Sequence, residues 1–243
     1  MQLLLQPDHR ANVVDGTFVD DSPSIKTRVL FCVIVLILTT FALMTHYLTP
    51  LEWNVAATRA AQSLTSSTLR EVMRLISGFG NAPKVIAITA LALFICNRPR
   101  QAVFLTLSGL GGWVIAIQLK HVFHAPRPAA ELVSVFHQWP DGSFPSGHLV
   151  FYVCYFGFLF FIAREELPRA SMLRRSLMVL TAGLAILVGF SRVYLGEHWT
   201  SDLPGSYLLG GLWLALCLKF YRAWVRARAP QNDWFLPYRT IEK

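Results

Sequence analysis

The sequence predicts an all-α membrane protein: a bundle of six transmembrane helices, with an additional interfacial helix between the first and second spans. Two observations lead to this fold class. Only 15% of the 243 residues are charged, whereas a soluble domain typically carries about 25%. The apolar residues also gather into long runs, and the clearest of these, residues 29–47, contains no Asp, Glu, Lys or Arg. A run of about 18 or more such residues is long enough to cross a hydrocarbon core of about 30 Å.

Six apolar runs are the predicted spans, in the order 28–48, 83–96, 102–120, 147–163, 171–190 and 203–220. The first run begins too far into the chain, and is followed by too poor a cleavage site, to be a cleavable signal peptide. We therefore expect one membrane domain, residues 28–220, between an N-terminal tail of residues 1–27 and a C-terminal tail of residues 221–243.

Lysine and arginine are distributed unevenly around these spans. With six spans both termini lie on one side of the membrane. That side carries 15 of the 22 lysines and arginines, in the two tails and around residues 97–100 and 164–175. The positive-inside rule therefore places both tails in the cytoplasm and the longer connections outside. Because the net charge of +8 resides at the ends of apolar runs, it indicates membrane topology and not a surface that binds nucleic acid.

The first outer connection, residues 49–82, contains signals for helices. Thr49, Pro50 and Glu52 form a capping-box start. Farther along, apolar side chains recur at helical spacing between charged ones, at Val72, Met73, Ile76 and Phe79. This pattern predicts a helix lying in the membrane interface; a helix that packs on the bundle explains it equally well.

Three cations stand out on the same outer side. Lys120, Arg127 and Arg192 lie at the ends of apolar runs, each beside a motif that contains histidine. A lone arginine in such a place usually anchors a helix end. Three of them on one face can instead surround one phosphate group, because guanidinium offers forked donors to its oxygens and lysine a compact charge.

Two further motifs carry candidate chemistry. Pro145-Ser146-Gly147-His148 has the composition of a helix start, where free backbone N–H groups suit an anion and His148 could donate a proton. His198 and Asp202 are four residues apart and share a face if the stretch is helical, so the carboxylate could fix the imidazole for attack. The alternatives are a capped helix with an interfacial histidine, and a simple surface pair.

Taken together, the motifs resemble those of the type 2 phosphatidic acid phosphatase (PAP2) superfamily. Its three signature blocks occur in order, as Lys120-x6-Arg127-Pro128, Pro145-Ser146-Gly147-His148 and Ser191-Arg192-x5-His198-x3-Asp202. The resemblance covers about residues 28–220 and departs at no signature residue.

The resemblance implies a role for each motif residue. His198 would be the nucleophile and form a phosphohistidine, Asp202 would orient it, and His148 would protonate the leaving group. The phosphate oxygens would be held by Lys120, Arg127, Ser146, Gly147 and Arg192, with Pro128, Pro145 and Ser191 in support. Fixed cations and a helix N-terminus can stabilise phosphoryl transfer without Mg²⁺, so we expect no metal and no cofactor.

The expected function is metal-independent hydrolysis of a lipid phosphate or diphosphate, with undecaprenyl diphosphate and phosphatidylglycerophosphate as the leading substrates. The expected location is a bacterial inner membrane, with the active site facing the periplasm or exterior. A phosphotransferase of the same fold is the alternative; a non-catalytic anion-binding protein and a vanadate-dependent haloperoxidase rank lower. The expected partners are the lipid substrate and the bilayer, without nucleic acid, and the sequence indicates no oligomeric state. We interpret His121, His124 and His137 as surface or interfacial histidines, and the role of Glu197 stays open.

Overall fold

The structure is a computed structural model that describes residues 33, 36, 37, 39–41, 43, 47, 52–64, 66–80 and 82–227. The chain divides into two compact units, Met1–Val35 and Leu36–Lys243, and every helix described below belongs to the second. The predicted first span and N-terminal tail fall mostly or wholly outside the described residues, as does most of the C-terminal tail.

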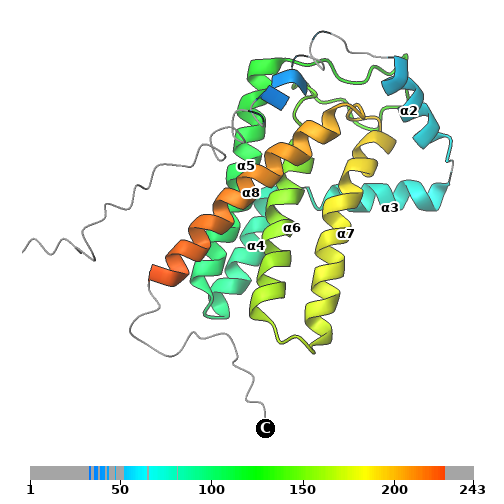
Figure 1. Ribbon diagram of the computed structural model, residues 1–243. Coiled ribbons are helices and arrows are strands. Elements are labelled where there is room, and N and C mark those ends of the chain that lie inside the picture. Colours follow the sequence, from blue (N-terminus) through cyan, green and yellow to red (C-terminus); the bar gives the residue numbers. More distant parts are fainter. Residues whose placement is uncertain are drawn as a thin grey trace, which may run out of the picture. The chain divides into compact units, whose positions relative to one another are not determined.

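The described part of the chain is helical and contains no strand (Figure 1). The expectation of an all-α fold is therefore confirmed for these residues. Their helices are α2 (Glu52–Gln62), α3 (Ser67–Gly78), α4 (Ala82–Ile95), α5 (Pro99–Phe123), α6 (Gly147–Glu166), α7 (Met172–Tyr194) and α8 (Asp202–Ala227).

Four of these helices, α5 to α8, are long and apolar enough to cross a membrane. They coincide with the predicted third to sixth spans, although α8 continues beyond the predicted end at residue 220. The predicted second span forms α4, but its 14 residues reach only about 21 Å at 1.5 Å per residue. This is shorter than a typical hydrocarbon core, so length and composition do not by themselves make α4 a span.

Side chains and prolines next to the helices determine where they begin and end. Ser66 and Ser171 accept hydrogen bonds from backbone N–H groups in the first turns of α3 and α7, and Pro99 stands at the start of α5, where its missing N–H is not needed. His124 adopts a left-handed conformation, with φ of 46°, and its N–H donates to the carbonyl of Lys120. His124 thus closes α5 at the end that carries the first signature block.

Helix α6 lies among its neighbours and packs against α5, α7 and α8. Its aromatic side chains form the centre of the core, with Phe151 and Tyr155 stacked at 5.1 Å between ring centroids. Small residues allow the helices to approach closely. A Cβ atom at Gly112 of α5 would lie 2.6 Å from Sγ of Cys154 in α6, so this contact requires glycine.

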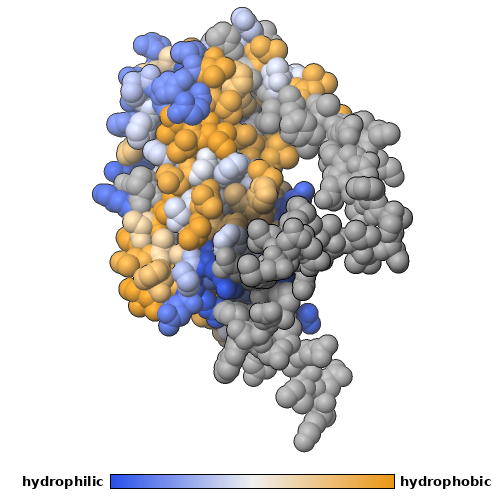
Figure 2. All heavy atoms as spheres, turned by 90° about the vertical axis from the view of Figure 1, so that its left-hand side faces the viewer, coloured by the Kyte–Doolittle hydropathy of each residue, from blue (hydrophilic) through white to orange (hydrophobic). Residues whose placement is uncertain are grey.

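Large apolar side chains are exposed along the outside of the helices, among them Ile88, Val103, Ile186 and Phe220. Figure 2 shows apolar residues gathered over the middle of one face, with hydrophilic residues toward its upper left and lower parts. A continuous apolar surface of this kind suits lipid tails, which solvate it without the cost it would have in water.

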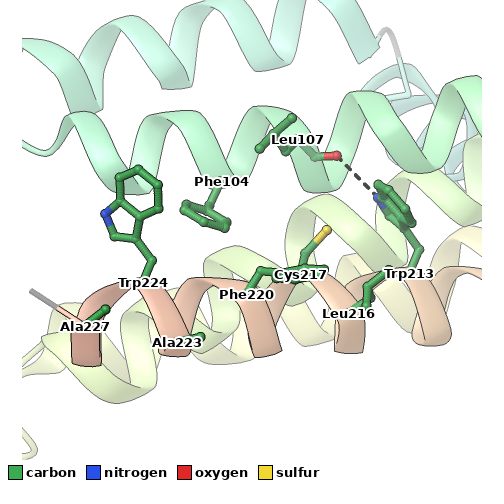
Figure 3. A pocket seen from close by; sticks show the side chains of 9 residues that line it. All are labelled: Phe104, Leu107, Trp213, Leu216, Cys217, Phe220, Ala223, Trp224 and Ala227. Atoms are coloured by element: carbon green, nitrogen blue, oxygen red, sulfur yellow. Dashed lines mark hydrogen bonds between the residues drawn. The ribbon is translucent and has the colours of Figure 1, made fainter. Parts of the chain in front are cut away.

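An apolar groove of about 550 Å³ lies between α5 and α8 (Figure 3). Phe104 and Leu107 line it from α5, and Trp213 and Trp224 from α8; Nε1 of Trp213 donates to the carbonyl of Leu107 at 3.3 Å. Along α5, Leu107 is about 20 Å from Lys120, because each residue adds about 1.5 Å. This groove is therefore remote from the motif residues.

Helix α3 forms where the sequence predicted an amphipathic helix, and it runs across the direction of α7 (Figure 1). It packs on α7. Met73 and Ile76 are buried, whereas Val72 and Phe79 are exposed. The apolar residues of the predicted helix thus belong to two different faces, one toward the bundle and one away from it.

Candidate active site

The motif residues converge at one end of the bundle, where α5 and α7 end and α6 and α8 begin (Figure 1). Lys120 and Arg192 lie in the last turns of α5 and α7, His148 in the first turn of α6, and Asp202 at the start of α8. The up-and-down path of the chain therefore brings all three signature blocks to the same place.

Asp202 holds the imidazole of His198 in a buried position. Nδ1 of His198 lies 3.2 Å from Oδ2 of Asp202, and the two side chains are 1% and 0% exposed. Residues 197–201 form a bend and a turn instead of a helix. The backbone N–H of Trp199 donates to the same Oδ2 at 3.0 Å, which curls this turn around the carboxylate. Because Nδ1 faces Asp202, Nε2 is the nitrogen available for attack.

Ser143 joins this pair, although no sequence motif singled it out. Its hydroxyl donates to Oδ2 of Asp202 and lies 3.4 Å from Nδ1 of His198, and the residue is fully buried. Oδ1 of Asp202 has no hydrogen-bond partner within the described ranges. Ser143 is thus a positioning residue that helps to fix the carboxylate behind His198.

Arg127 lies against the other side of the His198 ring. Its Nη1 is 3.5 Å from Nε2 of His198 and donates to the carbonyl of Glu197 at 2.7 Å, while its Nε donates to the carbonyl of Asp141 at 2.9 Å. Two backbone carbonyls therefore aim this guanidinium at the position where a group attacked by Nε2 would bind.

Lys120 and Arg127 share one carboxylate partner. Nζ of Lys120 lies 3.2 Å from Oδ2 of Asp141, and Nη2 of Arg127 lies 2.6 Å from Oδ1. Lys120 also donates to the carbonyl of Gly142. The first signature block is thereby tied to the segment that leads into the second.

Arg192 forms a buried ion pair with Glu197, the two side chains being 2% and 3% exposed. Nε1 of Trp139 donates to the same carboxylate at 2.7 Å, and Nη1 of Arg192 donates to Oγ of Ser77 in α3 at 2.6 Å. Nε of Arg192 has no partner among the residues described, so this donor remains for an anion. Glu197 supplies the counter-charge without which a buried guanidinium would be costly.

The second signature block forms the predicted helix start. Helix α6 begins at Gly147, and Oγ of Ser146 accepts from the N–H of Leu149; Pro145 follows a cis peptide bond. A Cβ at Gly147 would lie 3.8 Å from the Trp113 ring and 3.9 Å from Cε of Lys120. Both distances are ordinary contacts, and a helix N-terminus is a suitable place for an anion.

The His148 ring lies against the turn that follows α3. A Cβ atom at Gly80 would overlap Cδ2 of the His148 imidazole and lie 2.7 Å from its Nε2. Gly80 is buried. Only because residue 80 has no side chain can the His148 ring lie where it does. This contact links the first outer connection to His148, the predicted general acid.

Burial, together with the surrounding positive charges, keeps His198 neutral. Burial lowers the pKa of His198 well below its ordinary value of 6.5, and the positive charges of Arg127, Lys120 and Arg192, together with His148, lower it further. Burial alone would raise the pKa of Asp141, but Lys120 and Arg127 outweigh it and hold that pKa below the ordinary value. At neutral pH the site thus combines an uncharged imidazole with an ionised Asp141.

We expect this lowered pKa to appear in the pH dependence of turnover. Only unprotonated His198 can attack, so we expect the acid limb of kcat/KM, on which His198 becomes protonated, to lie below the ordinary histidine value of 6.5. The measurement is kcat/KM from neutral pH downward, with the ionisation of the substrate phosphate titrated separately by phosphorus NMR. His121→Gln, a change at an exposed position of α5, should leave the acid limb in place. An acid limb at or above 6.5 would contradict the expectation.

The remaining predicted residues lie around this centre. The hydroxyl of Ser191 donates to the carbonyl of Met73 at 2.7 Å, so it ties α7 to α3. Pro128 and His137 line a small pocket of about 130 Å³ beside Arg127 and Glu197.

Sequence reasoning assigned no site role to five residues that contact the motif side chains: Ser77, Gly80, Asp141, Ser143 and Glu197. The two carboxylates had an indirect signal, because cations that become buried require anions beside them. Ser143 stands only three residues before the signature Ser146. Ser77 and Gly80 reach the site from the first outer connection, and the sequence offers no signal for this.

Within the described ranges no group of three or more His, Cys, Asp or Glu side chains is arranged to hold a metal ion. The donors that surround the site are mainly cationic, which suits a bound anion.

Comparison with known proteins gives a consistent result. The chain matches the model of the PAP2 superfamily over residues 87–226. It is 27% identical over 158 residues to phosphatidylglycerophosphatase B of Bacillus subtilis, covering 64% of this chain and 76% of that protein. It is 26% identical over 152 residues to an undecaprenyl-diphosphatase of Sulfolobus acidocaldarius, covering 61% and 68%. The crystal structure of a transmembrane PAP2 type phosphatidylglycerolphosphate phosphatase from Bacillus subtilis superposes with a TM-score of 0.68 at 25% identity, covering 79% of this chain and 96% of that one.

Proposed function

Since this chain belongs to the PAP2 superfamily, we propose that it is an integral membrane lipid phosphatase that uses His198 as its nucleophile. The observation that carries the proposal is the geometry of His198, whose Nδ1 is held by Asp202 and whose Nε2 lies beside Arg127. A neutral, oriented imidazole beside a cation suits in-line attack on a phosphorus atom.

The reaction proceeds in two displacements. Nε2 of His198 attacks phosphorus, the bond to the leaving oxygen breaks, and His148 donates a proton to that oxygen. Water then attacks the phosphohistidine, His148 takes its proton, and the P–N bond breaks to release phosphate. Asp202 keeps Nδ1 protonated and oriented through both steps.

The phosphate oxygens are bound by the side chains and backbone groups that surround Nε2. Arg127 and Arg192 offer forked donors and Lys120 a compact charge, and the N-terminus of α6 adds the backbone N–H of Gly147. The free Nε of Arg192 supports this assignment. These groups stabilise the charge on the equatorial oxygens, the main requirement of phosphoryl transfer, so the mechanism requires no metal.

We assign undecaprenyl diphosphate or phosphatidylglycerophosphate as the substrate, because proteins similar to this chain carry the names of phosphatases for these lipids. The membrane domain comprises residues 28–220 and crosses the bilayer six times, with residues 28–48 as the first span and α4 as the second. The excess of lysine and arginine on one side supports cytoplasmic termini and an active site on the periplasmic or exterior face.

Helix α3 lies in the interface beside this site. Besides the face buried on the bundle, Val72, Leu75 and Phe79 share one exposed sector of the helix, and Glu71 and Arg74 share another. Three sectors of this kind match a helix at the boundary, with one side on protein, one on lipid and one in water. The lipid headgroup then enters at the level of α3, and its tails stay in the bilayer.

The test is phosphate release by the detergent-solubilised protein from undecaprenyl diphosphate, phosphatidylglycerophosphate, phosphatidate and lipid A, with EDTA present throughout. We expect release from at least one lipid at a rate that EDTA does not change. Loss of activity in EDTA that added Mg²⁺ restores would refute the metal-free mechanism. Release that requires a second lipid as acceptor would identify a phosphotransferase instead.

A further inference from the structure

Asp141 contacts two of the cations that the proposed function assigns to phosphate. Its two oxygens lie 3.2 Å from Nζ of Lys120 and 2.6 Å from Nη2 of Arg127. The side chains of Lys120 and Arg127 are only 5% and 14% exposed, whereas that of Asp141 is 35% exposed. One carboxylate thus presents two oxygens to two nearly buried cations, as two oxygens of a phosphate would.

The main chain beside Asp141 positions the same cations independently of the carboxylate. The carbonyl of Asp141 accepts from Nε of Arg127 at 2.9 Å, and the carbonyl of Gly142 accepts from Lys120. Because these contacts use backbone oxygens, the Asp141 side chain can rotate toward solvent while both cations stay in place.

Glu197, unlike Asp141, is a buried carboxylate that cannot turn toward solvent. Its side chain is 3% exposed and its Oε2 is held by Nε1 of Trp139 as well as by Arg192. Glu197 is therefore a fixed counter-charge of the site, and Asp141 is the accessible one.

We infer that Asp141 is an internal counter-anion that the substrate phosphate displaces from Lys120 and Arg127, and that its return after turnover weakens the binding of product phosphate. The inference rests on the proposed function and makes Asp141 a residue that determines anion affinity. In the free enzyme the carboxylate offsets the repulsion between the two buried cations. When phosphate leaves, the same carboxylate competes for the cations and limits product inhibition.

The test compares inorganic phosphate binding in the wild type, Asp141→Asn and Asp141→Ser. Removing the competing charge should lower the inhibition constant of phosphate, and its dissociation constant in calorimetry, by about tenfold or more. KM for the lipid should fall in the same direction. Asp141→Glu, which keeps the charge, should stay near the wild type. Glu131→Gln is the matched control, because it removes one negative charge from an exposed position of the same connection.

Tighter phosphate binding in the Asn or Ser variant, with Glu131→Gln unchanged, supports the inference. Equal or weaker binding in a folded Asp141 variant overturns it, because Asp141 would then hold the cations in both states. Failure of the proposed function would look different: the wild type would hydrolyse no lipid of the panel. Calorimetry with phosphate alone needs no turnover, so it still decides the role of Asp141.

Discussion

His198→Ala abolishes phosphate release, with an expected loss of about four orders of magnitude or more, the scale on which enzymes depend on a covalent nucleophile. The imidazole is the group that forms the bond to phosphorus. With alanine at this position the cations can still bind the substrate phosphate, but no nucleophile is left to attack it. The measurement is the initial rate with the lipid that the wild type hydrolyses fastest. Because His198 is 1% exposed and contacts buried Asp202, melting in detergent must show that the variant is folded.

A second readout separates a nucleophile from a histidine that merely shapes the site. Wild-type protein quenched during turnover with labelled lipid should retain acid-labile, base-stable phosphate, and His198→Ala should retain none. His121→Ala, at an exposed histidine of α5, should behave as the wild type in both assays. Equal rates in His198→Ala and the wild type would refute the assigned nucleophile.

Gly80→Ala is expected to lower kcat by about a hundredfold, the cost typical of a misplaced catalytic group. The added methyl group would overlap Cδ2 of the His148 ring and would also lie 2.7 Å from its Nε2. This clash is relieved only if the imidazole or the turn after α3 moves. Either movement changes the direction from which a proton reaches the leaving oxygen. The measurement is kcat and KM for the same lipid, and kcat should carry most of the loss.

Gly78→Ala is the matched control for this substitution. Gly78 is the last residue of α3, and a Cβ atom there would meet nothing within 4 Å. The two variants make the same chemical change two residues apart, so their difference isolates contact with His148 from any general effect of alanine near the helix end. Similar activity in Gly80→Ala and Gly78→Ala would show that the His148 ring tolerates the methyl group.

Much of the fold could be predicted because long apolar runs are a local property of the sequence. Helices α5 to α8 were predicted within a few residues at most ends, since Ser146 and Ser171 mark two of the starts. Helix α4 shows the limit of this reasoning. Its apolar composition resembles that of a span, but the helix ends at Ile95 after 14 residues, so its length alone does not identify it as one.

The candidate site was likewise predicted from the sequence only in part. The three signature blocks could be found because their residues have fixed spacing, and the structure brings them together. The His198–Asp202 contact was expected from a helical face, whereas a turn around the carboxylate produces it. The contacts of Asp141 and Gly80 join segments that no periodicity relates, because they depend on how the outer connections fold over the helix ends. Such contacts follow from tertiary packing, which a single sequence does not display.

All motif residues lie at one end of the bundle, and this has a consequence for flux. A phosphatase built in this way consumes lipid from a single leaflet. A phospholipid made in the opposite leaflet reaches it only after crossing the bilayer, so at steady state its rate cannot exceed the rate of transbilayer delivery. By consuming the substrate lipid in one leaflet, the protein would also maintain a concentration difference of that lipid between the leaflets. This difference would give the exchange of the lipid between leaflets a net direction toward the enzyme.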